Sequence, residues 1–313
     1  MGEPRQRFRY DQASAISQGG RDYQEDAIVT DFSSGAEVAL AVLSDGMGGH
    51  AAGDVASKIV VTEVFSELVF RRNDLVATPG ETGAILRGAA ESANACLNAH
   101  VHTHPETKGM GATLVCFAII DGGLHWISIG DSPLFLFRDN VLTQLNEDHS
   151  LGPHIDMLVR SGAMSEVEGR NHPERNALTS VLLGQEIAQV DCPDAPYPLQ
   201  AGDTVIVASD GLQYLTHDEI TQILRERPFA RSAEIADALM KRVEALEDPD
   251  LDNVTFSVVQ VQNDIAAADA PGEGVAKSAA PLSRWPFRKR DPMVDPATIG
   301  HRLRDAAQRG ARD

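Results

Sequence analysis

Short apolar runs separated by polar turns constrain the fold of this 313-residue chain more than any other feature of its sequence. Six of these runs have the length of β-strands, and several are almost continuously apolar, as is typical of strands covered on both faces. They lie at Val38–Leu43, Leu114–Ile120, Trp126–Ile129, Leu134–Phe137, Val205–Ala208 and Val254–Val261. The runs occur in sets rather than in strict alternation with helices, which favours packed sheets flanked by helices over a doubly wound sheet.

Apolar residues at three- and four-residue spacing predict helices between these sets of strands. The predicted helices span residues 52–70, 84–100, 220–224 and 232–246. Strands and helices together fill residues 1–262, so we expect an α+β fold over that region.

Composition and charge exclude several classes of protein. The chain carries 46 acidic and 27 basic residues, and this excess argues against binding nucleic acid, which needs Lys and Arg to neutralise phosphates. No apolar run reaches the roughly 20 residues of a membrane-spanning helix, and the first residues lack the apolar stretch of a secretory signal. Cys96, Cys116 and Cys192 show no paired spacing, so we expect no disulfide framework, no zinc site and a cytoplasmic location.

The composition changes near residue 262. Residues 263–313 are rich in Ala, Pro and Gly without periodicity, which predicts a disordered tail or linker. This tail has nine basic and seven acidic residues, so the acidity of the chain belongs to residues 1–262. Within it, Arg284–Arg290 is basic and aromatic, and Thr298–Arg309 has the pattern of a short helix. Either the tail is solvated, or it docks on a partner or an anionic surface.

Aspartates stand at the ends of four predicted strands. Asp45, Asp131 and Asp210 follow apolar runs, and Asp252 comes just before the run that begins at Val254. One such aspartate commonly forms a turn or caps a helix. Four of them indicate convergence on a cation, because a buried carboxylate is costly unless something neutralises it. Carboxylate and carbonyl oxygens are the ligands of Mg²⁺ and Mn²⁺.

A second charged segment places Arg21 shortly before two adjacent acids, Glu25 and Asp26. The fork of a guanidinium group can bind two phosphate oxygens at once, and the acids would lie beside it. By itself, the segment also fits a charged surface turn.

Eight segments of the chain occur in the order seen in metal-dependent Ser/Thr protein phosphatases (protein phosphatase type 2C). They are RDYQEDA (21–27), LSDGMGGHAAGDVAS (43–57), GMGATLVC (109–116), ISIGDS (127–132), DHSL (148–151), RNALT (175–179), ASDGL (208–212) and DNVT (252–255). Residues 9–262 thus resemble this family, in its bacterial branch, where DGMGGH replaces the eukaryotic pattern. The resemblance implies two packed antiparallel β-sheets flanked by pairs of α-helices, with the metals in a channel at one end.

The resemblance also implies ligands for two central Mn²⁺ or Mg²⁺ ions. Asp45 is similar to the aspartate that bridges the two ions, and Gly46 to the glycine whose carbonyl binds one of them. Asp210 and Asp252 match the aspartates that complete the ligands of the first ion.

Further matches concern the second ion, the substrate and a third ion. Glu25 and Asp26 match acids that hold the waters of the second ion. Arg21 matches the phosphate-binding arginine. Asp131 matches a residue that binds a third ion, together with Asp210, in bacterial members.

The reaction implied by the resemblance is hydrolysis of phosphoserine and phosphothreonine in proteins by direct attack of a metal-bridging hydroxide. A metal pair lowers the pKa of a bridging water and offsets charge on the phosphoryl oxygens. The expected partners of this monomeric enzyme are phosphorylated proteins, namely a Ser/Thr kinase and its targets. Two alternatives stay open: a phosphatase dedicated to one regulatory protein, or a non-catalytic phosphoprotein-binding module with the same fold.

Two positions depart from the family pattern. Met47 stands where eukaryotic members have a histidine that is thought to protonate the leaving group, and Pro133 stands where the family often has arginine. His50 is close to Met47 in sequence, but a packing or hydrogen-bonding role suits it better, so the leaving-group acid is not identified. Residues 148–185 resemble the mobile flap of bacterial members, built from short pieces with a helix around 156–161.

Overall fold

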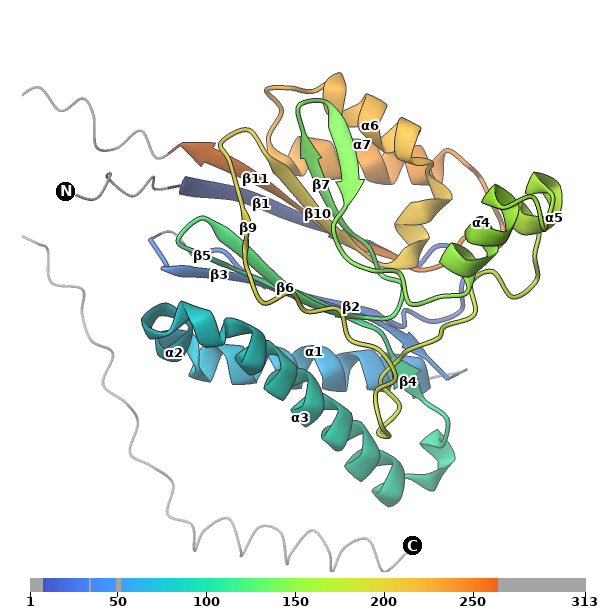
Figure 1. The fold of residues 1–313 in the computed structure, drawn as a ribbon, viewed down its shortest axis with the longest axis horizontal. Helices are drawn as coiled ribbons and strands as arrows, with labels where there is room; N and C mark the ends of the chain where they lie inside the picture. Colours follow the sequence, from blue (N-terminus) through green and yellow to red (C-terminus); the bar gives the residue numbers. More distant parts are fainter. Residues whose placement is uncertain (1–7, 34, 49–51, 264–313) are drawn as a thin grey trace, which may run out of the picture. The chain divides into compact units, whose positions relative to one another are not determined.

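The computed structural model describes residues 8–33, 35–48 and 52–263 of the chain (Figure 1). These residues belong to the first of two units, Met1–Ala267, and the second unit, Ala268–Asp313, lies outside the described residues. The predicted tail segments Arg284–Arg290 and Thr298–Arg309 therefore lie outside them too, as does His50.

Two antiparallel sheets form the centre of the fold, as the sequence predicts (Figure 1). The five-stranded sheet has the order β1-β11-β10-β7-β8 and consists of β1 (Phe8–Ser17), β7 (Leu134–Arg138), β8 (Val141–Gln144), β10 (Thr204–Ala208) and β11 (Val254–Asn263). The six-stranded sheet has the order β2-β3-β5-β6-β9, with β4 paired to β3, and consists of β2 (Asp26–Asp31), β3 (Val38–Met47), β4 (Gly111–Ala112), β5 (Leu114–Ile120), β6 (Gly123–Ile129) and β9 (Tyr197–Pro198).

A pair of helices covers the outer face of each sheet (Figure 1). On the six-stranded sheet these are α1 (Ala52–Phe70) and α3 (Thr82–Thr103), and on the five-stranded sheet α6 (His217–Arg225) and α7 (Ser232–Glu244). Three short helices complete the set: α2 (Arg72–Ala77), α4 (Gly152–Arg160) and α5 (Glu166–Arg170). Among the described residues, no helix is long and apolar enough to cross a membrane. The α+β class and the paired flanking helices are thereby confirmed.

The two faces of β3 show why its sequence is continuously apolar. Successive side chains of a strand point to opposite faces, and both faces of β3 are covered. The two sets are Val38, Leu40 and Val42 on the helix side and Ala39, Ala41 and Leu43 in the layer between the sheets. The same layer receives apolar residues from β5, β10 and β11, so the two sheets share one core.

Two strands that the apolar runs do not reveal, β1 and β2, lie at sheet edges. The sequence of β1, FRYDQASAIS, mixes polar and apolar residues, and most of its side chains are partly exposed. Pairing with β11 along ten residues, from Phe8 opposite Asn263 to Ser17 opposite Val254, holds it in the sheet. The backbone pairing of β1 is thus set by its neighbour rather than by its own hydrophobic pattern.

Phe117 on β5 provides a test of the layer between the sheets, where its side chain is fully buried. Phe117→Ala should lower the free energy of unfolding by about 3–5 kcal/mol, because it removes buried apolar surface and leaves a cavity. Phe70→Ala, at a side chain that is 87% exposed, is the matched control and should change stability by less than about 0.5 kcal/mol. Urea unfolding of both variants measures the difference, and equal stabilities would contradict the assignment of the core.

Candidate metal centre

In the six-stranded sheet, strand register brings two of the predicted acids together. Asp26, at the start of β2, lies directly opposite Asp45, near the end of β3. The next residue, Gly46, donates its backbone N–H to the carbonyl of Glu25 at 3.0 Å. A Cβ atom at Gly46 would lie 2.0 Å from the carbonyl oxygen of Gly53, so only glycine fits this close approach of three backbone segments.

In the five-stranded sheet, Asp210 follows β10 and Asp252 precedes β11. These strands are antiparallel neighbours, so both aspartates lie at the same end of the sheet. Ser209 connects this end to the other sheet, because its hydroxyl donates to Oδ2 of Asp26 at 2.7 Å. The Ser209 backbone N–H donates to the carbonyl of Thr255 at 2.8 Å and fixes the serine in place.

The loop between β1 and β2, residues 18–25, is held against the start of β11 by the buried amide of Asn253. Its Nδ2 donates to two carbonyl groups of the loop at 2.8 and 2.9 Å, and its Oδ1 accepts the backbone N–H of Glu25 at 2.7 Å. The guanidinium of Arg21, in the same loop, donates to Oδ2 of Asp252. The structure therefore brings Arg21 to the predicted acids.

Asp131 lies in the turn after β6, and a threonine connects that turn to Asp45. The hydroxyl of Thr113 accepts the backbone N–H of Asp45 at 2.9 Å and lies 2.9 Å from the hydroxyl of Ser132. Thr113 is buried, and so is Ser132. The hydroxyl of Thr113 thus connects the backbone of Asp45 to the residue that follows Asp131, and both aspartates are predicted metal ligands.

Thr113, Ser209 and Asn253 are functional positions that the sequence reasoning did not single out. Each lies inside a motif that carries the resemblance, and Ser209 and Asn253 are next to Asp210 and Asp252 in the sequence. Their position in the motifs was the available signal, but only the structure shows the atoms that they join.

Burial and mutual repulsion dominate the electrostatics of these acids. Burial, together with the nearby charge of Asp210, raises the pKa of Asp26 and that of Asp131 to about 7. Burial also raises the pKa of Asp45, where the charges of Asp26 and Asp210 act in the same direction. The pKa of Glu25 is raised in the same way, mainly by burial. Carboxyl groups that resist ionisation together favour a compensating cation.

The donor set fits divalent cations. Three buried carboxylate oxygens have no hydrogen-bond partner among the described residues: Oε1 of Glu25, Oδ1 of Asp26 and Oδ1 of Asp210. In the described ranges, no group of three or more His, Cys, Asp or Glu side chains is placed so that it could hold a metal ion as it stands, and Asp252 is paired with Arg21. The fit therefore rests on oxygen chemistry, raised pKa values and unpaired buried oxygens.

The structure shows the surroundings of the two positions that depart from the family pattern. Pro133 is buried, and its carbonyl accepts the backbone N–H of Ala208 at 3.0 Å, where β7 and β10 begin to pair. Pro133 therefore contributes to the start of the pairing between β7 and β10 in the five-stranded sheet. Met47, the other departure, ends β3 with its side chain 40% exposed.

The segment that resembles a flap contains two short helices, α4 and α5, rather than one rigid element. The predicted helix around 156–161 is present but begins four residues earlier, at Gly152. Arg175 joins the two halves of the segment through two hydrogen bonds to the carboxylate of Asp156, at 2.7 and 3.0 Å.

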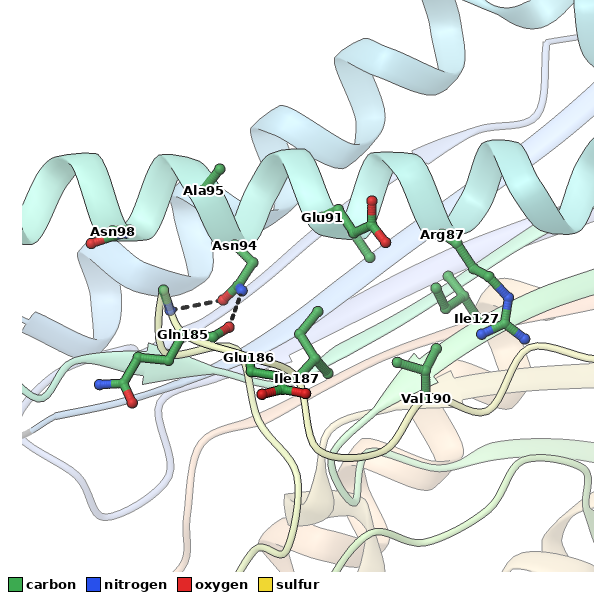
Figure 2. Close-up of a pocket in the computed structure, with 12 residues that line it drawn as sticks. Arg87, Glu91, Asn94, Ala95, Asn98, Ile127, Gln185, Glu186, Ile187 and Val190 are labelled. Atoms are coloured by element: carbon green, nitrogen blue, oxygen red, sulfur yellow. Dashed lines mark hydrogen bonds between the residues drawn. The ribbon is translucent and has the colours of Figure 1, made fainter.

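A cavity of about 480 Å³ lies elsewhere, between α3 and residues 184–190 (Figure 2). Figure 2 shows Asn94 of α3 bonded to this loop, with Ile127 and Val190 below the helix and Arg87 to one side. None of the eight predicted site residues lines this cavity. A ligand usually binds in a concave site, but this cavity lies apart from the acids that the sequence predicts as metal ligands.

The family profile described as protein phosphatase 2C matches residues 13–254. The chain belongs to this family, and the resemblance found in its motifs is confirmed.

Three relatives illustrate the comparison. The serine/threonine protein phosphatase PstP of Mycobacterium tuberculosis is 34% identical over 222 residues, which cover 71% of this chain and 40% of that protein. The serine/threonine phosphatase stp of Listeria monocytogenes is 31% identical over 71% of this chain and 84% of its own length. A crystal structure of the PstP catalytic domain in complex with two manganese ions has 28% identity and a TM-score of 0.64, and covers 82% of this chain and all of that one.

The raised pKa of Asp131 predicts how stability depends on pH when divalent ions are chelated. The folded value, about 7, lies above the unfolded value of about 4, so the protonated carboxyl stabilises the fold at low pH. This contribution is lost as the pH rises through about 7. The variant Asp131→Asn keeps a neutral side chain, so its stability relative to the parent should grow between pH 4 and pH 7 and stay constant above.

Urea unfolding of the parent and Asp131→Asn in EDTA, from pH 4.5 to 8.5, measures this difference. Other titrating groups are common to both proteins and cancel. A stability difference that is the same at every pH would show that Asp131 ionises normally in the folded chain.

Proposed function

We propose that this protein is a metal-dependent phosphatase that hydrolyses phosphoserine and phosphothreonine in proteins. The observation that carries the proposal is the meeting of Asp45, Asp131, Asp210 and Asp252 from both sheets at one end of the fold, beside Glu25, Asp26 and Arg21. PstP and stp, which share the family, bear the name of the same activity.

The proposed ligands follow the donor set. Asp45, Asp210 and Asp252 would hold the first of two central Mn²⁺ or Mg²⁺ ions, with Asp45 bridging to the second, and the carbonyl of Gly46 would bind one of the two. Glu25 and Asp26 would hold waters of the second ion, and Asp131 would bind a third ion together with Asp210. The unpaired oxygens of Glu25, Asp26 and Asp210 support the first two of these assignments. The two manganese ions of the PstP structure agree with a central pair.

Bound divalent ions would supply a water acidic enough to attack phosphorus near neutral pH and would offset charge on the phosphoryl oxygens. The chain itself orients the substrate. Arg21 is half exposed at the rim of the acids, with a guanidinium fork that matches two oxygens of a phosphoryl group. Asp252 pairs with Arg21 and so restricts the arc over which that fork can move. Thr113, Ser209 and Asn253 hold the backbone segments at fixed spacing.

We further propose the setting of this activity. The substrates are phosphorylated proteins, among them a Ser/Thr kinase and its targets, and the enzyme acts as a cytoplasmic monomer. Residues 1–262 form the catalytic domain, with its flap at about 148–185, and residues 263–313 form a separate tail. A phosphatase dedicated to one regulatory protein would share the same site and differ only in the surface around it.

Loss of a proposed ligand tests the metal dependence. Purified protein should hydrolyse a phosphothreonine peptide with Mn²⁺ or Mg²⁺ and should stop in EDTA. Asp210→Asn should lower kcat/KM by more than about 100-fold, since even the residues that support metal ligands cost about 10- to 100-fold when removed. Asp237→Asn, at an exposed position on α7, is the matched control and should retain full activity. A parent protein that binds Mn²⁺ but leaves the peptide intact would favour a phosphoprotein-binding module.

Removal of Arg21 tests the substrate contact separately. Arg21→Ala should chiefly raise KM for phosphate esters, by about 10- to 100-fold, because a charge-assisted hydrogen bond is worth about 1.5–3 kcal/mol. Arg71→Ala, on a partly exposed guanidinium far along the chain, controls for the loss of a positive charge. Steady-state kinetics with a small aryl phosphate separate kcat from KM. Unchanged constants in Arg21→Ala would refute the assigned role.

A further inference from the structure

His149 lies where the turn that carries Asp131 meets the flap segment, and its side chain is only 2% exposed. Its backbone N–H donates to the carbonyl of Gly130 at 3.0 Å. In return, the N–H of Gly130 donates to Nδ1 of the His149 ring at 3.2 Å. Both backbone groups of the residue next to Asp131 are therefore bound by one histidine.

The turn cannot easily shift away from this contact. Gly130 has a φ of 109°, a backbone conformation that favours glycine. A Cβ atom at this position would lie 2.6 Å from Cγ2 of Thr113, so the turn is packed against the threonine that bonds to Asp45. Gly130 is thus held between Thr113 on one side and His149 on the other.

Both ends of the flap segment are joined by backbone pairing at His149 and at the next residue. Its carbonyl accepts the backbone N–H of Thr179 at 2.7 Å, and Ser150 pairs with Leu178 in an isolated bridge. Residues 151–177, with α4 and α5, leave from and return to this point. A displacement of the flap segment would therefore reach the Asp131 turn through His149.

The ring of His149 has a defined tautomer in this arrangement. A neutral imidazole has one donor and one acceptor nitrogen, and Nδ1 is the acceptor here, so the proton is on Nε2. Nε2 is buried and has no hydrogen-bond partner among the described residues, and the nearest carboxylate oxygen, Oε2 of Glu147, is 3.9 Å away. Among the described residues, Nδ1 thus has a hydrogen-bond partner in Gly130, whereas Nε2 has none.

We propose that His149 is a positioning residue, which holds the Asp131 turn through Nδ1 and couples the orientation of Asp131 to the flap segment. This inference rests on the proposed function, because it is the phosphatase reaction that would use Asp131. His149 itself need not touch the substrate.

Two substitutions separate the two ring nitrogens. Asn places an amide oxygen near the position of Nδ1, so His149→Asn can still accept the N–H of Gly130. Gln extends its amide toward the position of Nε2, so His149→Gln leaves that N–H without its acceptor. We expect kcat of His149→Gln to fall by about 10- to 100-fold, because a misplaced catalytic group costs rates of this order. KM should stay near the parent value, since Arg21 is untouched, and His149→Asn should remain close to the parent in both constants.

Two measurements report the contact without relying on activity. In protein labelled with ¹⁵N-histidine, NMR should show the His149 ring of the parent with its proton on Nε2. Hydrogen exchange of the Gly130 amide should be slow in the parent and in His149→Asn and faster in His149→Gln. A parent ring protonated on Nδ1, or equal kcat and equal exchange in the two variants, would overturn the proposal. The tautomer of the His149 ring in the parent tests the proposal even if a variant does not fold.

Failure of this inference is distinguishable from failure of the proposed function. An inactive parent with the expected tautomer would refute the phosphatase proposal and leave the contact in place. An active parent whose Gln variant matches its Asn variant would refute the role of His149 alone.

Discussion

The repulsion among buried carboxylates at one end of the two sheets is the constraint on which the rest of the site depends. Burial raises the pKa of Asp26, Asp45, Asp131 and Asp210, and each is raised further by the charge of at least one other acid. A fold keeps such a group only if other interactions hold it there, and here the shared apolar layer between the sheets does so. Bound cations would relieve this repulsion, because they favour the ionised form of every acid at once.

Short hydrogen bonds from neutral side chains determine where the acids lie. The hydroxyl of Ser209 reaches from one sheet to Asp26 of the other, and the hydroxyl of Thr113 connects Asp45 to the Asp131 turn. The amide of Asn253 fixes the loop that carries Glu25. These residues carry no charge of their own, so they set geometry without adding to the repulsion. The ring of His149 acts in the same manner on the far side of Gly130.

The sequence predicted the parts of this fold in which a strand buries both faces. The continuous apolar runs of β3, β5, β10 and β11 have that origin, although β3 continues four residues beyond the predicted end, to Met47. Edge strands such as β1 were not predicted, because backbone pairing with a neighbour rather than their own side chains holds them in the sheet. The sequence singled out Asp45, Asp131, Asp210 and Asp252 as candidate ligands because a buried carboxylate at a strand end is costly unless something neutralises it. Thr113, Ser209 and Asn253 were not predicted, because the sequence does not show which atom each of these polar side chains hydrogen-bonds to.

Binding of Mn²⁺ to the metal-free protein tests whether the buried acids form a cation site. Isothermal titration in buffers of different ionisation enthalpy counts both the ions bound and the protons released. We expect at least two Mn²⁺ ions per chain and net proton release near pH 6.5, because Asp26 and Asp131, with pKa values of about 7, must ionise when the site fills. Asp45→Asn should abolish the tight binding. No Mn²⁺ binding by the parent, or binding without proton release that survives Asp45→Asn, would show that these acids do not form a cation site.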